Sequence, residues 1–77
     1  MNWMSLDSSA LKSAAYLPEE RVLYLQFQSG EIYRYFDFPP KLYQEFLTAE
    51  SKGTYFGQSI RDKFRYQRLP RIRRAGG

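Results

Sequence analysis

The side chains best suited to chemistry in this chain are arginines near its C-terminal end. Four of them follow one another at intervals of three or four residues, namely Arg61, Arg65, Arg68 and Arg71. A guanidinium presents a planar fork of N–H donors that matches a phosphate group, and it also stacks on planar rings. Their type and spacing therefore predict an anion-binding surface, with a nucleic acid as the first candidate.

The distribution of charge points the same way. Residues 1–60 carry five basic and seven acidic side chains, whereas residues 61–77 carry seven basic side chains and one acidic one. If four to six of these cations contact phosphates, log affinity should fall with log salt at a slope of about −4 to −5. The alternative is a solvated basic tail that only aids solubility.

Several function classes find no support in the composition. The chain of 77 residues has no cysteine and no histidine, which removes disulfides, zinc-binding motifs and imidazole-based catalysis. Its carboxylates are scattered without the spacing of metal ligands, and no glycine-rich phosphate loop is present. We therefore expect a binding protein rather than an enzyme, with no catalytic residue, metal site or cofactor.

The sequence also allows an expectation about the cellular location of the protein. No apolar run approaches the roughly 18–20 residues of a membrane span, and the N-terminal residues lack the pattern of a secretory signal. A cytoplasmic protein without a membrane partner is expected.

The scaffold is organised around an aromatic β-hairpin at residues 21–36. Two alternating runs, 22–27 and 32–36, flank Ser29-Gly30. A two-residue loop would place Arg34 opposite Leu25, within an apolar face. A three-residue loop with Gly30 in the left-handed position of a bulge separates apolar from mixed residues better, and we prefer it.

This register assigns each face of the hairpin. Leu23, Leu25 and Phe27 share one face with Tyr33 and Tyr35, which makes the two tyrosines core residues under the helices rather than a stacking platform. The opposite face then carries Tyr24, Arg34 and Phe36. Because a short domain cannot easily cover both faces of its sheet, these three predict a stacking surface for bases or a dimer interface.

The remaining segments complete an α+β fold. Residues 8–17 are interpreted as a strand, with a helix as the competing interpretation, and Pro18 suits the following turn. Pro40 begins an amphipathic helix of about ten residues. Thr54 caps a second helix that ends at 69–70, with Phe56, Ile60 and Phe64 facing the sheet and the arginines along one edge.

The prediction is thus a three-stranded antiparallel β-meander with two short helices on one face. It forms a single domain over residues 8–67, between flexible termini at 1–7 and 68–77, the latter a disordered basic tail.

A known family shares this order of residues. The chain has Ser8-Ser9, Leu-x-Leu-x-Phe-x-x-Gly at 23–30, Tyr-Arg-Tyr at 33–35, Ala-x-Ser-x-Gly at 49–53, Tyr55-Phe56 and Ile60-Arg61. In this it resembles the KTSC domain, found at the C-terminus of some lysyl-tRNA synthetases and as small stand-alone bacterial and phage proteins. The resemblance covers residues 8–66. Where the family often has Asn after the Tyr/Phe pair, this chain has Gly57.

The resemblance implies the fold and, from the attachment to a tRNA ligase, RNA binding; it implies no catalytic residues. The sequence thus predicts a module that binds RNA or another nucleic acid. The residues expected to do so are Tyr24, Arg34, Phe36, Arg61, Arg65, Arg68 and Arg71. The alternative is an accessory protein of bacterial or phage origin that binds a protein, a second copy or a small anionic ligand such as a nucleotide. A further hypothesis is that the terminal Gly76-Gly77 serves like the exposed diglycine at the end of ubiquitin-like modifiers.

Overall fold

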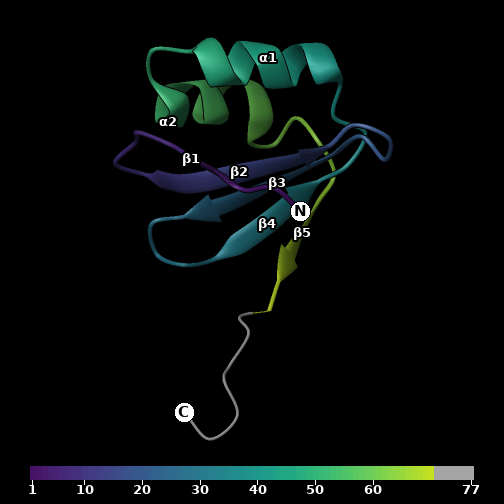
Figure 1. Ribbon diagram of the computed structural model, residues 1–77, viewed down its shortest axis with the longest axis horizontal. Coiled ribbons are helices and arrows are strands. Elements are labelled where there is room, and N and C mark those ends of the chain that lie inside the picture. Colours follow the sequence, from purple (N-terminus) through teal and green to yellow (C-terminus); the bar gives the residue numbers. More distant parts are fainter. Residues whose placement is uncertain (71–77) are drawn as a thin grey trace, which may run out of the picture.

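An antiparallel β-sheet and a layer of helices on one of its faces make up the protein (Figure 1). The structure is a computed structural model that describes residues 1–70. The five strands lie in the sheet in the order of the chain. They are β1 Met4–Ser5, β2 Leu11–Leu17, β3 Val22–Phe27, β4 Ile32–Tyr35 and β5 Tyr66–Leu69.

The central hairpin has the predicted register. Leu25 lies opposite Tyr33, and Tyr24 lies opposite Arg34. The Phe27 N–H donates to the Glu31 carbonyl at 2.9 Å, and the Gly30 N–H donates to the Phe27 carbonyl at 2.8 Å, so three residues form the loop. Gly30 has φ 96°, in the region that favours glycine. The three-residue loop with a left-handed glycine is confirmed.

The first predicted strand and the first predicted helix are also present. Residues 11–17 form β2 rather than a helix, and the Glu20 N–H donates to the Leu17 carbonyl to close the turn at Pro18. The helix α1 spans Pro40–Thr48 with proline in its first turn, where the missing N–H removes no intrahelical hydrogen bond.

The second helical segment is shorter than predicted. It consists of α2, Lys52–Tyr55, and a π-helical turn η1, Phe56–Ile60, and its N-terminus is capped by Ser51 rather than Thr54. The segment ends because Arg61 has an extended ψ of 130° and Asp62 has a φ of 62°. The predicted helix to residue 69 is therefore wrong.

The sheet has five strands where three were expected. Residues 66–69 form β5 along β4, because the outer edge of β4 has backbone donors and acceptors that need partners. Met4–Ser5 pairs with β2, inside a segment that was expected to be a flexible terminus. Of the predicted basic tail at 68–77, residues 68 and 69 lie in β5 and Pro70 follows the strand. Residues 71–77, including Gly76-Gly77, lie outside the described residues.

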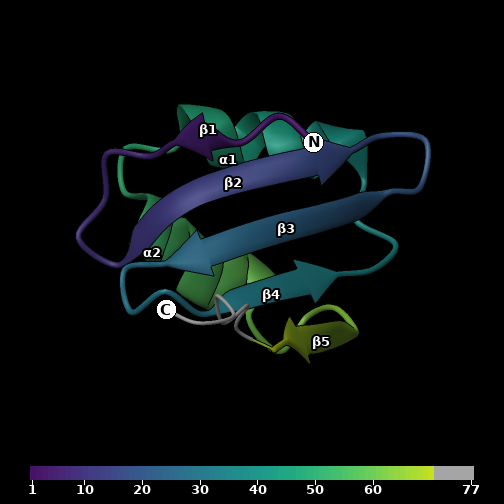
Figure 2. The same ribbon diagram turned by 60° about the horizontal axis from the view of Figure 1, so that its bottom comes forward.

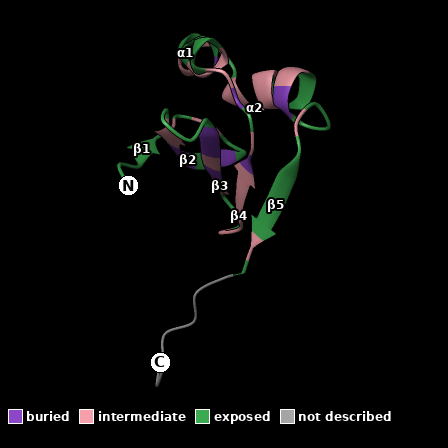
Figure 3. Cartoon of the chain, turned by 90° about the vertical axis from the view of Figure 1, so that its right-hand side faces the viewer, coloured by how far each residue is buried: buried purple, intermediate pink, exposed green. Residues whose placement is uncertain are grey.

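The core lies between the sheet and the helices (Figure 3). Leu23 and Leu25 of β3 face Phe46 of α1 and Ile60 of η1, and all four side chains are fully buried. Phe38, on the link from β4 to α1, is buried beside them and packs on Phe64 with ring centroids 4.8 Å apart. Among residues 1–70, no helix is both long and apolar enough to cross a membrane.

Candidate nucleic-acid interface

The face of the sheet that points away from the helices carries the cluster of cations and aromatic rings. Figure 2 looks onto this face, with β2, β3 and β4 in front and the helices behind them. Side chains alternate between the two faces along each strand. The pairing of Tyr24 with Arg34, and of Arg34 with Gln67, therefore places these three side chains side by side on the open face.

Arg34 is held in the middle of this group by its neighbours. Its Nε donates to the Gln67 side-chain oxygen at 2.8 Å, and its terminal nitrogens reach the same oxygen and, at 3.4 Å, the Tyr24 hydroxyl. These contacts fix the plane of the guanidinium, because its donors diverge in a rigid fork.

Phe36 continues the cluster towards the end of the hairpin. The guanidinium carbon of Arg34 lies 5.3 Å from the centre of the Phe36 ring, and that of Arg65 lies 4.7 Å from it. Both separations are those of cation–π contacts. The Phe36 N–H also donates to the Arg65 carbonyl at 2.9 Å, which anchors Arg65 just before β5 begins.

Two further residues join the cluster that the sequence analysis did not single out. Trp3 packs edge-on against Tyr24 at a centroid distance of 6.3 Å and stays 40% exposed. Gln67 comes from β5. Strand alternation assigns the face of Gln67 only once β5 is recognised, and Trp3 precedes β1, so no local pattern places it. We call the set Trp3, Tyr24, Arg34, Phe36, Arg65 and Gln67 the arginine–aromatic face.

The charges of this face are open to solvent. The Arg65 side chain is 74% exposed, and Asp37, the acidic group beside it, lies at 4.0 Å and is itself 87% exposed. An ion pair of this kind is screened by water and contributes little. Arg65 can therefore exchange Asp37 for a phosphate at small cost.

Arg61 and Arg68, which were also predicted to bind nucleic acid, do not lie on the arginine–aromatic face. Arg68 lies opposite Tyr33, on the helix side of the sheet, and forms an ion pair with Glu31 at 3.0 Å. Arg61 follows η1, also on that side. The predicted single stripe of arginines is wrong, because β5 alternates its side chains where a helix would have aligned them. Arg71 lies outside the described residues.

Tyr33 and Tyr35 face the helices, as the register predicted. Tyr35 is only 3% exposed, and burial raises the pKa of its hydroxyl well above the ordinary value of 10.0. Tyr33 is half-buried, and its ring contacts Phe27 and Tyr66. Among residues 1–70 no three acidic side chains gather in a group that could hold a metal ion.

The comparisons with known proteins agree with one another. The profile of the KTSC domain matches residues 7–64. An uncharacterized protein of Stutzerimonas stutzeri is 40% identical over 70 residues, which cover 90% of this chain and 99% of that protein. A KTSC domain protein of Yersinia pestis, solved by crystallography, is 32% identical with a TM-score of 0.87, covering 90% of this chain and 97% of that one.

A third relative is much longer. A lysine–tRNA ligase of Nostoc sp. is 40% identical over 63 residues, which cover 82% of this chain and 11% of the ligase. The shared region is therefore one small part of that enzyme. All three relatives are bacterial proteins.

Proposed function

The chain belongs to the KTSC domain family, and we propose that it is a small non-enzymatic module that binds single-stranded RNA on the arginine–aromatic face. The observation that carries the proposal is the pair of guanidiniums on Phe36. They lie at 5.3 Å and 4.7 Å from its ring, beside the half-buried Tyr24 and the exposed Trp3. Aromatic rings and guanidinium planes are the surfaces on which unpaired bases stack.

The two guanidiniums on Phe36 are also suited to bind the phosphate groups of a single-stranded RNA. Phe36 restrains both guanidiniums before any ligand arrives, so less side-chain freedom is lost on binding. Their N–H donors match phosphate oxygens, and the surrounding sheet surface is open. A sheet with exposed rings is the surface that many single-strand-binding domains present. Among residues 1–70, this face carries no helix that could enter a groove of a duplex.

RNA is favoured over other polyanions because a similar region occurs within an enzyme that acts on a transfer RNA. The Nostoc relative is named as a ligase that acts on a transfer RNA, and it carries a region similar to this chain. A module attached to such an enzyme gains most if it holds the RNA substrate. A cytoplasmic location belongs to the same proposal.

Fluorescence anisotropy with a labelled single-stranded RNA of about 12 nucleotides tests the proposal, a length that small single-strand-binding modules cover. Each arginine that contacts a phosphate contributes about −0.7 to the slope of log affinity on log salt. Arg65→Gln should therefore make the slope shallower by about 0.7. Arg68→Gln removes the same charge from the other side of β5 and is the matched control.

Two results would count against the proposal. If the wild-type protein binds the RNA with no dependence on salt, phosphate contacts do not drive binding. If Arg68→Gln and Arg65→Gln weaken binding equally, the arginine–aromatic face is not the site. A protein that has no affinity for RNA but sediments as a dimer would favour the alternative, in which this face binds a second copy.

A further inference from the structure

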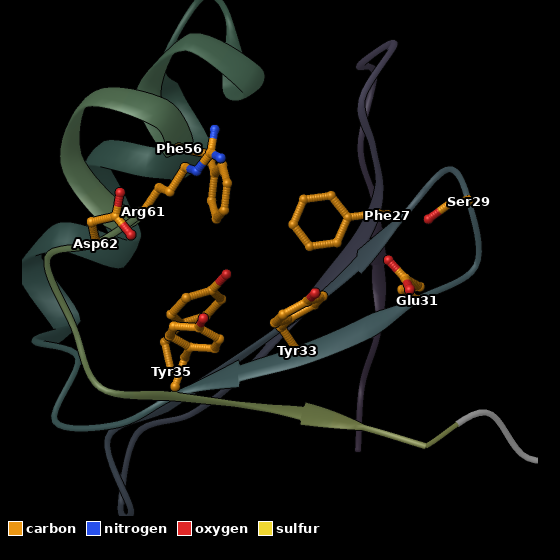
Figure 4. Close-up of a pocket in the computed structure, with 9 residues that line it drawn as sticks. Phe27, Ser29, Glu31, Tyr33, Tyr35, Phe56, Arg61 and Asp62 are labelled. Carbon is orange, nitrogen blue, oxygen red and sulfur yellow. The ribbon is translucent and has the colours of Figure 1, made fainter.

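A cleft of about 390 Å³ lies on the helix side of the sheet, away from the arginine–aromatic face. Figure 4 shows Phe27, Tyr33, Tyr35 and Phe56 of η1 arranged around an open space. The volume falls within the range of pockets that hold small molecules. Tyr66 of β5 completes the lining, together with rim residues that include Arg61.

The walls of the cleft are aromatic and mutually supported. Tyr66 lies 5.7 Å from Tyr33 and 5.8 Å from Tyr35 between ring centroids, so three tyrosine rings form one continuous wall. Phe56 and Phe27 form the adjoining wall, with their centroids 5.3 Å apart and an interplanar angle of 78°. A planar ring that enters this space can stack on one wall and meet ring edges on the other.

Hydrogen-bonding groups face the same space. Within residues 1–70 the hydroxyls of Tyr33, Tyr35 and Tyr66 form no hydrogen bond with the protein. Tyr35 lines the cleft although the residue is only 3% exposed, and no buried side-chain oxygen or nitrogen in this part of the chain lacks a partner. The Tyr35 hydroxyl is neutral below pH 10.0, so it can donate a hydrogen bond as well as accept one.

The charged residues that line the cleft are Glu31, Arg61 and Asp62. Glu31 is occupied by Arg68 at 3.0 Å, whereas Arg61 has no carboxylate within 4.0 Å among the described residues. Arg61 lines the cleft, and its side chain is drawn next to Phe56 in Figure 4. Burial is the main cause of the raised pKa of Tyr35, while Arg61 lowers this pKa and Asp62 raises it, so both charges act on the Tyr35 hydroxyl. Arg61 is therefore the side chain of the lining that can hold an anion.

From these observations we infer that the cleft is a second ligand site, which takes a nucleobase against the tyrosine wall and the attached phosphate at Arg61. The ligand is either a free mononucleotide or the phosphorylated terminal nucleotide of an RNA. The site is separate from the arginine–aromatic face, because β5 directs Tyr66 to the cleft and Gln67 to the open face. It stands whether or not that face binds RNA.

Titration calorimetry with adenosine 5′-monophosphate tests the inference, with adenosine and inorganic phosphate as separate probes. The mononucleotide should bind saturably and at least tenfold more tightly than either fragment, because both halves of the site are used. Arg61→Gln should weaken its binding about tenfold, the usual effect of losing a charge-assisted hydrogen bond. Tyr66→Ala, at a residue that is 54% exposed and so tolerant of truncation, should weaken it by a similar factor.

Arg65→Gln removes an equal charge from the arginine–aromatic face and should leave mononucleotide binding unchanged. Competition by a single-stranded RNA with a 5′-phosphate, but not without one, would assign the site to RNA ends. Failure of both RNAs to compete would assign it to free nucleotides, and either result supports the cleft. Absence of saturable mononucleotide binding, or equal losses in Arg61→Gln and Arg65→Gln, would overturn the inference.

Discussion

Replacing Gly30 with valine should destabilise the protein by straining the hairpin loop. The residue has φ 96°, and its N–H closes the loop onto Phe27 at 2.8 Å. A β-branched residue is strained at positive φ, and such strain costs about 1–3 kcal/mol. For a domain of this size each kcal/mol corresponds to about 4–8 °C in melting temperature, so a decrease of about 5–20 °C is expected.

Thermal unfolding followed by circular dichroism measures this decrease, and Gly57→Ala supplies the control. Gly57 lies in η1, and a Cβ added there meets no atom within 4 Å. Alanine should therefore raise stability by about 0.4–1 kcal/mol through its lower entropy in the unfolded chain. Gly30→Asn should fall between the two, since asparagine tolerates positive φ. An unchanged melting temperature for Gly30→Val would refute the bulge as the element that sets the register.

Two further predictions concern alkaline pH and fluorescence. Burial raises the pKa of Tyr35, so the folded state holds its proton more tightly than the unfolded chain; stability should be fully present below pH 10.0 and fall as pH rises above it. Urea unfolding should show this decrease, and Tyr35→Phe should reduce its slope. Trp3 is the single tryptophan and lies against Tyr24, so RNA on the arginine–aromatic face should change its fluorescence, whereas a mononucleotide in the cleft should not.

The hairpin was predictable because its information is local. Alternation assigns each residue of 22–27 and 32–36 to a face, and one glycine decides between the two possible registers. That register alone placed Tyr24, Arg34 and Phe36 together and turned Tyr33 and Tyr35 towards the helices. The start of α1 was also predictable from the sequence, since Pro40 suits the first turn of a helix. No contact with a distant part of the chain is needed to place it.

The C-terminal part was not predictable in the same way. Phe56, Ile60 and Phe64 fit a helical spacing, yet Phe64 reaches Phe38 from an irregular segment after η1. Residues 66–69 contain too few apolar side chains to signal a strand, and they become one because β4 offers an unpaired edge. The same pairing separates Arg65 from Arg68 and creates the cleft, so the site depends on contacts that the local pattern does not contain.

Chemical-shift mapping with a short single-stranded RNA at two salt concentrations tests the central claim most directly. We predict that the largest shifts occur at Arg34, Phe36, Arg65 and the Trp3 indole, and that they shrink as salt rises from about 50 to about 200 mM. Helix α1, on the far side of the sheet, should remain unshifted. A spectrum that does not change, or shifts confined to α1, would contradict RNA binding on the arginine–aromatic face.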